Sequence, residues 1–281
     1  MSGVAIETHG LGKRYRSLWA LKDFSVSLPA NKVIALVGAN GAGKSTLMSI
    51  AAGILPASEG EIHIDGRVVL LSQEKPLYRS FKVSDMLAFG RHLNRVWDQQ
   101  RALNWLGRFD IPLDRPCGKL SGGQQTQVAM SVALGARPSV LLLDEPLANL
   151  DPVARRDVTG ELLAEVADSD MTVVLSTHVV AELAGVGDHL LLLSQGHSTL
   201  DGDVEDLLTQ HARLVGPRAA APPVEGQVVQ EQHTERQSTF VVRTLLGADT
   251  PVAEPWKAQP LTLEDLVLAY LKPNRSPGEE L

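Results

Sequence analysis

The chain has 281 residues, with 26 Lys and Arg against 33 Asp and Glu and a formal net charge of −7. This length suits one large α/β domain, or one domain with a small accessory module. The acidic balance argues against nucleic acid as a partner, because sequence-independent binding needs a basic surface. The single cysteine, Cys117, excludes an internal disulfide. No apolar run reaches the roughly 18–20 residues that span a bilayer, and residues 1–10 lack the apolar core of a signal peptide. We therefore expect a soluble protein of a reducing cytosol, whose membrane role, if any, acts through a partner.

Short strands are expected in the N-terminal part of the chain. Before about residue 85 the pattern indicates strands at Val4–Ile6, Phe24–Leu28, Val33–Val37, Glu61–Ile64 and Val68–Leu71. The last two are predicted to form a hairpin around Asp65-Gly66, a sequence typical of a two-residue turn. Between residues 83 and 109 the apolar residues recur at helical spacing, which predicts an inserted helical subdomain over about residues 83–122.

Helices and apolar strands alternate in the next part of the chain. They are expected at helix Gly122–Gly135, strand Val140–Leu143, helix Pro152–Ala167, strand Thr172–Leu175, helix Val179–Ala184 and strand His189–Leu193. This alternation predicts an α/β fold with a mainly parallel sheet covered by helices on both faces. The N-terminal strands are expected to form an antiparallel β part.

A Pro- and Ala-rich break that begins with Gly216, at residues 216–223, has the composition of a linker. Beyond it, Gln227–Gln230 and Thr239–Arg243 indicate short strands. A final helix is predicted over Leu263–Leu271, with Thr262 as its cap and one apolar face. We therefore predict a main domain over residues 1–212 and a small α+β accessory module over residues 213–281.

The Gly-rich run after Val33–Val37 carries the first chemical signal. It lies between a predicted strand and a predicted helix, the context of a phosphate-binding P-loop. Its glycines let several N–H groups point into one concavity, and the helix N-terminus adds about half a unit of positive charge. Lys44 can reach the β- and γ-phosphates, and the Ser45 hydroxyl can ligate Mg²⁺. The predicted phosphate-binding residues are Gly38, Ala39, Asn40, Gly41, Ala42, Gly43, Lys44, Ser45 and Thr46.

Two further motifs specify which kind of P-loop NTPase core this is. Leu120-Ser121-Gly122-Gly123-Gln124 opens a helix, and the apolar strand Val140–Leu143 ends in Asp144-Glu145. Together they resemble the signature and Walker B motifs of ATP-binding cassette (ABC) ATPases, over roughly residues 3–212. Ser121 is a good N-cap, and the amides of Gly122 and Gly123 start a helix, which makes a second anion-binding terminus. The resemblance implies that two subunits associate head to tail and sandwich two ATP molecules, so that Ser121, Gly122, Gly123 and Gln124 contact the ATP of the opposite subunit.

Four residues are expected to carry the chemistry. Asp144 ends a buried strand, where a carboxylate needs a compensating partner such as Mg²⁺, and Glu145 is the candidate general base. Gln73, between a strand and the helical segment, resembles the Q-loop glutamine that ligates Mg²⁺ and couples the nucleotide state to the helical subdomain. His178 resembles the switch histidine that contacts the γ-phosphate and orients the attacking water. The expected metal ligands are thus Ser45, Gln73 and Asp144.

Two more positions follow from the resemblance, and one segment departs from it. Asp151 resembles the D-loop residue that crosses the dimer interface, and Tyr15 resembles the aromatic residue that stacks on adenine, with Trp19 the weaker alternative. Many family members carry Arg where this chain has Gln125-Thr126-Gln127-Val128. That departure removes charge that could support a local ion-pair network or dimer contact, but no group of the hydrolysis chemistry.

The resemblance implies an ATPase subunit, homodimeric by expectation, that powers a transmembrane permease from the cytoplasmic face of the membrane. The segment Leu261–Tyr270 resembles the C-terminal helix of exporter-type subunits, so we expect an exporter, with an importer as the nearer alternative. A soluble ABC ATPase of an assembly system is a further alternative. The 48 residues from Gln73 to Ser121 leave no room for the long coiled coil of DNA-repair members. A binding module without turnover is disfavoured by Glu145 and His178.

Overall fold

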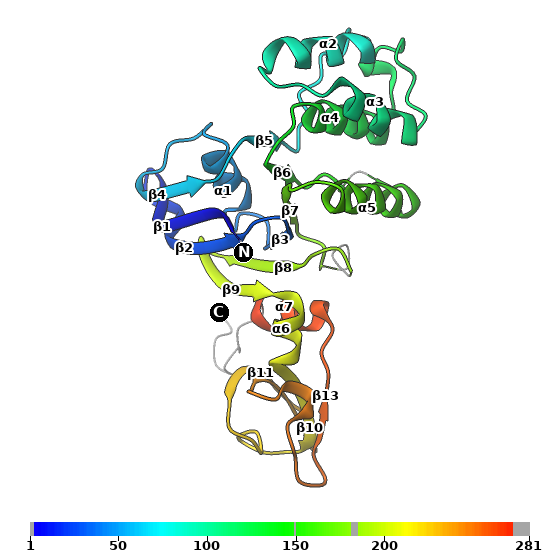
Figure 1. The fold of residues 1–281 in the computed structure, drawn as a ribbon. Coiled ribbons are helices and arrows are strands. Elements are labelled where there is room, and N and C mark those ends of the chain that lie inside the picture. The colour runs from blue at the N-terminus through cyan, green and yellow to red at the C-terminus, as the bar shows by residue number, and fades with distance from the viewer. Residues whose placement is uncertain (1–2, 149, 181–184, 272–281) are drawn as a thin grey trace.

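The computed structural model describes residues 3–148, 150–180 and 185–271, and it contains a six-stranded central sheet (Figure 1). Its strand order is β5 (Val68–Leu71), β6 (Val140–Asp144), β7 (Thr172–Thr177), β3 (Val33–Val37), β8 (His189–Ser194) and β9 (His197–Asp203). All neighbouring pairs are parallel except β8 with β9. The central strands are buried along their whole length, as their continuous apolar runs require. The predicted α/β fold with a mainly parallel sheet is confirmed.

A second, antiparallel sheet covers the P-loop side of the molecule. Its order is β2 (Leu18–Pro29), β1 (Val4–Tyr15) and β4 (Glu59–Ile64). Helix α1 (Lys44–Ala51) lies between the two sheets, where Met48 shares one core with Leu11 and Phe24 of the antiparallel sheet and Leu36 of β3. This core fixes the start of α1 against the end of β3.

The predicted hairpin around Asp65-Gly66 is wrong. Glu61–Ile64 pairs with β1 in the antiparallel sheet, whereas Val68–Leu71 pairs in parallel with β6 at the edge of the central sheet. The segment between them therefore crosses from one sheet to the other, with Gly66 at a φ of 94°. The local turn sequence does not decide the pairing, because all four residues of the apolar strand Val68–Leu71 pair with the buried apolar strand β6.

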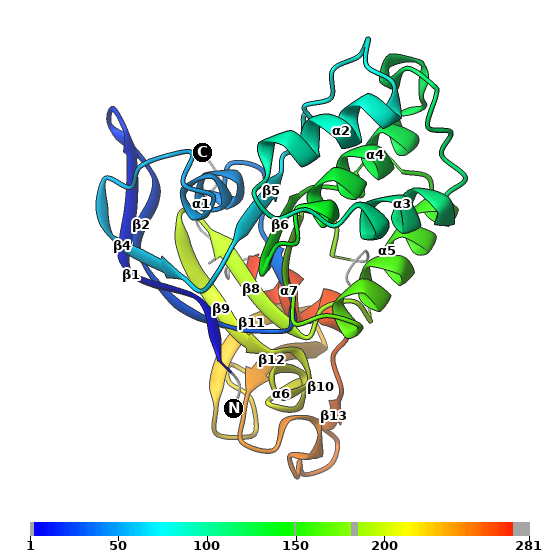
Figure 2. The same ribbon diagram turned by 45° about the horizontal axis from the view of Figure 1, so that its top comes forward.

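The chain between β5 and β6 is helical, as the spacing of its apolar residues indicates. Helices α2 (Val83–Leu93), α3 (Gln99–Arg108) and α4 (Gly122–Gly135) share a core that includes Met86, Leu106 and Cys117, and a short 3₁₀ turn, Cys117–Lys119, precedes α4. Helix α5 (Pro152–Ala167) covers the central sheet next to them, and Figure 2 shows α3, α4 and α5 side by side. The helix expected at Val179–Ala184 falls largely on residues 181–184, which lie outside the described residues.

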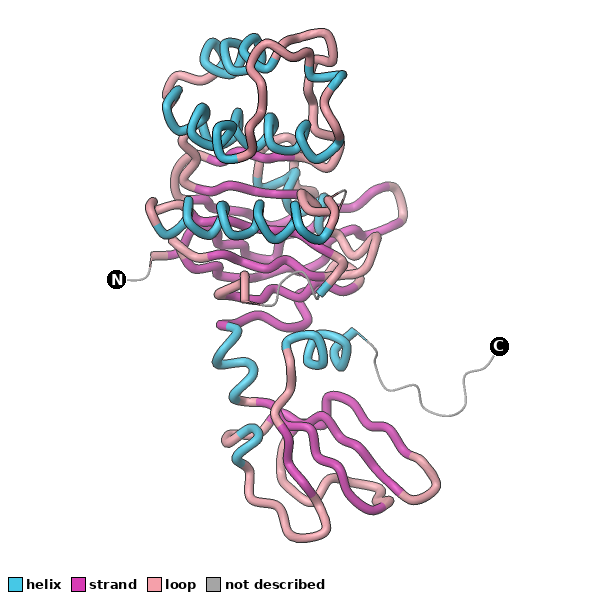
Figure 3. Tube along the Cα trace, turned by 90° about the vertical axis from the view of Figure 1, so that its right-hand side faces the viewer, coloured by secondary structure: helices cyan, strands magenta, loops and turns pink. Residues whose placement is uncertain are grey.

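The C-terminal part contains a four-stranded antiparallel sheet on the opposite side of the central sheet from α2–α4 (Figure 3). Its order is β11 (Gln227–His233), β12 (Gln237–Arg243), β10 (His211–Pro217) and β13 (Lys257–Gln259). Helix α6 (Val204–Thr209) leads into this sheet, and a short 3₁₀ turn, Gly247–Asp249, follows β12. Phe240 and neighbouring side chains give the sheet a small core of its own.

The predicted C-terminal helix is present as α7 (Leu263–Leu271). Its first turn is capped as expected: the Asp265 N–H donates to Thr262 Oγ1 at 3.1 Å. Leu266 and Val267 of α7 belong to the same core as Leu190 and Leu192 of β8, so the end of the described chain returns to the central sheet. Among the described residues, no helix is long and apolar enough to cross a membrane.

Candidate functional site

The Gly-rich run forms a tight loop between the end of β3 and the start of α1. Gly43 has a φ of 113°, and a Cβ there would lie 2.4 Å from the carbonyl oxygen of Ala20 in β2. A Cβ on Gly38 would lie 2.4 Å from the carbonyl oxygen of Leu193 in β8. Both positions therefore accept only glycine without rearrangement of the neighbouring backbone. The resulting loop holds the first N–H groups of α1 towards one cavity.

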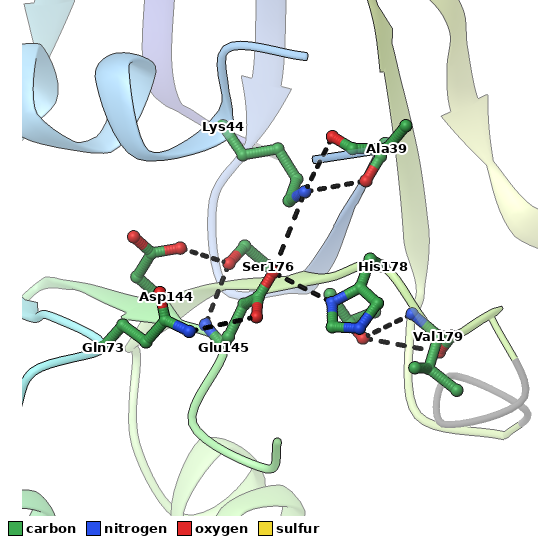
Figure 4. Close-up of polar contacts among 10 residues, drawn as sticks. Ala39, Lys44, Gln73, Asp144, Glu145, Ser176, His178 and Val179 are labelled. Carbon is green, nitrogen blue, oxygen red and sulfur yellow. Dashed lines mark hydrogen bonds and ion pairs between the residues drawn. The ribbon is translucent and has the colours of Figure 1, made fainter. Parts of the chain in front are cut away.

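Lys44 points back over this loop. Its Nζ donates to the Gly38 carbonyl oxygen at 2.7 Å and to the Ala39 carbonyl oxygen at 3.3 Å (Figure 4). Burial lowers the pKa of the Lys44 ammonium, and the carboxylates of Glu145 and Asp144 act in the opposite direction. The ammonium is therefore partly desolvated beside two acidic groups and suits contact with a polyanion.

The carboxyl ends of β6 and β7 meet through Ser176. Asp144, the last residue of β6, pairs in register with Ser176 of β7 and accepts a hydrogen bond from Ser176 Oγ at 2.6 Å. The Glu145 N–H donates to the same Ser176 oxygen at 2.9 Å. Glu145 has a φ of 49°, an uncommon conformation for a residue other than glycine. Ser176 thus fixes both acidic residues at the point where the chain leaves β6.

The Glu145 carboxylate is the centre of the polar cluster in Figure 4. Its Oε1 lies 3.0 Å from His178 Nδ1 and 3.9 Å from Lys44 Nζ, and its Oε2 accepts from Gln73 Nε2 at 3.5 Å. An ionised carboxylate can only accept, so Nδ1 of His178 carries the proton of that bond. The Glu145 side chain is 12% exposed and that of His178 41% exposed, so the cluster lies at a cavity wall.

A cavity of about 560 Å³ lies in front of this cluster, in the size range of small-molecule sites. It brings together the predicted P-loop residues with Gln73, Glu145 and His178, and its lining comprises Ala20, Asn40, Gly41, Gly43, Lys44, Ser45, Thr46, Gln73, Glu145, Ala148 and His178. Asp144 lies behind Glu145 and is almost completely buried. A carboxylate that can take a proton therefore faces a loop of phosphate-binding geometry.

The donor set at this cavity fits Mg²⁺. Ser45 and Gln73 line the cavity and Asp144 lies next to it, and their hydroxyl, amide and carboxylate oxygens are the hard ligands that this ion takes. Gln73 uses its Nε2 for Glu145, which leaves its carbonyl oxygen as the atom for a cation. No cluster of three or more His, Cys, Asp or Glu suited to a metal occurs among the described residues, so a magnesium ion here would depend on oxygens of the substrate and water as well.

The predicted signature residues lie at a different cavity, of about 480 Å³. Ser121 Oγ accepts from the Gln124 N–H at 3.2 Å, and Gln124 Oε1 accepts from the Ser121 N–H at 3.1 Å, a capping box at the start of α4. Asp151 caps α5 in the same way, accepting from the N–H groups of Val153 and Ala154 at 3.0 Å. Two helix N-termini therefore open on this second cavity, and its lining shares no residue with the first.

Tyr15 lines neither of these two cavities. It ends β1, is 46% exposed, and lies under Lys13 Nζ at 5.6 Å from the ring centre. Trp19, the alternative, lies across the same hairpin against Arg14. Asn149, part of the expected D-loop, lies outside the described residues.

Two contacts that position site residues are not predicted by the sequence motifs. The first is the hydrogen bond of Ser176 to Asp144, and the only indication of it in the sequence is the place of Ser176 at a strand end, two residues before His178. The other lies in the segment that departs from the family pattern: Gln127 Oε1 accepts a hydrogen bond from the buried Trp105 Nε1 at 3.0 Å. In the same segment, Thr126 Oγ1 donates to the Gly122 carbonyl oxygen at 3.0 Å. The residues that replace arginine thus make local neutral hydrogen bonds.

The fold and the first cavity together define a P-loop NTPase, and comparison with known proteins narrows the class. A family model described as ABC transporter matches residues 21–148. The molybdenum import ATP-binding protein ModC of Mycobacterium tuberculosis is 35% identical over 224 residues, which is 70% of this chain and 61% of ModC. The aliphatic sulfonates import ATP-binding protein SsuB of Yersinia pestis is 34% identical over 209 residues, 71% of this chain and 76% of SsuB.

A solved structure agrees with these matches. The cbiO1 protein of Clostridium perfringens, part of an ABC transporter complex, is 28% identical and superposes with a TM-score of 0.63 over 73% of this chain and 90% of its own. The chain therefore belongs to the family of ABC transporter ATP-binding proteins. The matched region spans about three fifths of the length of ModC.

Proposed function

We propose that this protein hydrolyses ATP as one of two nucleotide-binding subunits of a membrane importer. The observation that carries the proposal is the Glu145 carboxylate, which faces a P-loop cavity and contacts Lys44, Gln73 and His178. The family membership supports the ATP-binding part. The Glu145 carboxylate, which can accept a proton from water, supports hydrolysis of ATP rather than binding of ATP alone.

The proposed chemistry uses groups from the ends of four neighbouring strands, β5, β6, β7 and β3. The P-loop N–H groups bind the β- and γ-phosphates, and Lys44 exchanges its two carbonyl partners for phosphate oxygens. Water attacks the γ-phosphorus while Glu145 accepts its proton, the bond to the bridging oxygen breaks, and ADP and phosphate leave. His178 orients the Glu145 carboxylate and the water. When bound through Ser45, Gln73 and Asp144, Mg²⁺ would offset the charge of the phosphates.

The second cavity supports a head-to-tail dimer as the working form. One chain presents the P-loop cavity and the signature cavity as separate sites with no lining residue in common. A helix N-terminus attracts an anion, and a second copy can bring the Ser121–Gly123 N–H groups to the phosphates that the first copy holds. The adenine is assigned to Tyr15 in the same proposal, since an exposed aromatic ring at the end of β1 is available for stacking.

The direction of transport is proposed as import. The two curated relatives described above are both named as import proteins, whereas the exporter prediction depended on the short Leu261–Tyr270 pattern. In the structure the apolar residues of that pattern, such as Leu263 and Leu266, pack α7 against the core. The pattern therefore has a packing reason that is independent of the transported substrate. The exporter prediction has no support from the relatives.

The domain division is part of the same proposal: a cassette over residues 1–212 and an accessory module over residues 213–281. The module has its own antiparallel sheet and small core, which supports a stabilising or dimer-contact role. The subunit would work at the cytoplasmic face of the membrane and attach there through the permease.

The proposal is tested with the Glu145→Gln variant. It should bind ATP and form dimers, as measured by light scattering, but it should release no phosphate. Tagged Glu145→Gln protein with ATP should also recover a multi-span membrane protein from detergent-solubilised membranes. Near-normal turnover of the variant would remove Glu145 as the base, and recovery of soluble partners alone would favour an assembly ATPase.

A further inference from the structure

Three ion pairs link helix α3 to helix α5 at a distance from the nucleotide cavity. Arg101 Nε donates to Glu165 Oε2 at 2.8 Å, and Arg108 Nη1 donates to Glu165 Oε1 at 3.1 Å. Arg108 Nη1 also forms an ion pair with Glu161 Oε2 at 2.9 Å. The Glu165 side chain is only 10% exposed. A carboxylate so deep in the protein needs compensating charge, and both of its oxygens receive it from guanidinium groups of one helix.

The same face of α3 also holds helix α4. Arg101, Trp105 and Arg108 follow at the spacing that places residues on one side of a helix. Trp105 is fully buried, and its Nε1 donates to Gln127 Oε1 of α4 at 3.0 Å. Ser131 Oγ of α4 donates to the Ala102 carbonyl oxygen at 2.8 Å. Helix α3 is thus bonded to both α5 and α4, and it lies beside both helices in Figures 1 and 2.

Helices α4 and α5 form the two walls of the signature cavity. Gly123 and Gln127 line it from the first turns of α4, and Asp151 and Val158 line it from the start of α5. The position of α4 relative to α5 therefore sets the shape of this cavity. The bonds of Glu165 hold that relative position through α3, although Glu165 itself does not line the cavity.

We propose that Glu165 is a positioning residue for the signature helix. By clamping α3 to α5 through Arg101 and Arg108, it holds the start of α4 where the signature N–H groups meet a nucleotide on a second copy. This inference rests on the proposed ATP-driven dimer. It separates two properties of one chain: the P-loop binds nucleotide without the clamp, whereas closure of the dimer around ATP depends on it.

The test compares Glu165→Gln with a matched control in the Glu145→Gln background, where ATP is not consumed. Glu161→Gln is the control, because it is the same substitution one helical turn away, and Glu161 is 37% exposed and forms an ion pair with Arg108. The ATP concentration for half-maximal dimer is measured by light scattering. ADP affinity, measured at a protein concentration that keeps the chain monomeric, reports the P-loop separately.

Glu165→Gln is expected to raise the ATP concentration for half-maximal dimer about tenfold, because the half-buried Arg101 loses its charged partner and Arg108 keeps only Glu161. Its ADP affinity should stay within about twofold of the parent, and Glu161→Gln should move neither quantity by more than about twofold. Arg101→Gln is the second variant. It keeps the ion pair of Arg108 with Glu165, so it should lose less folding stability than Glu165→Gln. It should shift dimerisation in the same direction.

Two results would overturn the inference. One is dimerisation of Glu165→Gln and Arg101→Gln at the ATP concentration of the parent. The other is an equal loss of ADP affinity and dimerisation, which would mark the clamp as a general stabiliser. Failure of the Glu145→Gln parent itself to dimerise on ATP is a separate outcome, because it refutes the proposed function before the clamp is tested.

Discussion

Replacing Ser176 with alanine tests how the two acidic residues are held at the end of β6. The change removes the hydroxyl that donates to Asp144 at 2.6 Å and accepts from the Glu145 N–H at 2.9 Å. A hydrogen bond to a charged group contributes about 1.5–3 kcal/mol and a neutral one about 0.5–1.5 kcal/mol. The free energy of unfolding should therefore fall by about 2–4 kcal/mol.

The same loss should appear in catalysis. Without Ser176, neither the Asp144 carboxylate nor the left-handed backbone of Glu145 is fixed at the cavity. If about half of that energy acts in the transition state, the turnover number falls about 5- to 30-fold. ATP affinity should change little, because the P-loop itself keeps its contacts.

Urea unfolding and a steady-state phosphate-release assay measure the two effects of Ser176→Ala. Ser238→Ala is the matched control, since Ser238 is also fully buried and hydrogen-bonded to Ala219, but it lies in the C-terminal sheet. It should lose stability and keep its turnover number. Turnover of Ser176→Ala within about twofold of the parent, alongside the expected loss of stability, would refute the positioning argument.

Two further predictions concern charge. Lys44→Ala should weaken ATP binding about 10- to 100-fold in an equilibrium titration, because a charge-assisted contact to phosphate is lost, and unchanged affinity would refute the P-loop assignment. His211 is buried between the Leu207 carbonyl oxygen at 2.6 Å and Tyr270 Oη at 2.9 Å, and burial, with a smaller effect of Arg243, lowers its pKa below the ordinary value. The unfolded chain therefore binds a proton at this histidine more readily than the folded chain does. The folded protein keeps its full stability above the ordinary histidine pKa of about 6.5. As the pH falls from there towards the lower pKa of folded His211, the free energy of unfolding decreases. Unfolding scans at pH 7.5 and 5.5 should show this loss, and His211→Asn should reduce it; an equal pH dependence in that variant would contradict the assignment.

Contiguous motifs made the P-loop and the Asp144-Glu145 pair predictable, because a strand, a turn and a helix N-terminus are encoded within a few residues of one another. The meeting of Gln73, Glu145 and His178 was also predictable in outline, since parallel strands bring their carboxyl ends to one edge of a sheet. Their roles in hydrolysis stay predictions until the variants above are measured.

Other features depend on information that local sequence does not carry. Ser176 acquires its role from the register of β6 against β7. Gln127 acquires its role from a contact with Trp105, which lies 22 residues earlier in the chain and in another helix. The hairpin error at Asp65-Gly66 has the same origin, because turn propensity is local whereas pairing follows burial over the whole sheet.

The return of α7 to the central sheet changes how the C-terminal sheet should be regarded. The chain enters that sheet after α6 and leaves it into α7, and both helices contribute residues, Leu207 and Leu266, to the core that contains Leu190. The proposed division at residue 212 therefore places α7 in the accessory module by sequence, although α7 packs in the core of the cassette. Cutting the chain at residue 212 would remove α7 from the core that it shares with β8, so a clean deletion has to excise the sheet and rejoin α6 to α7.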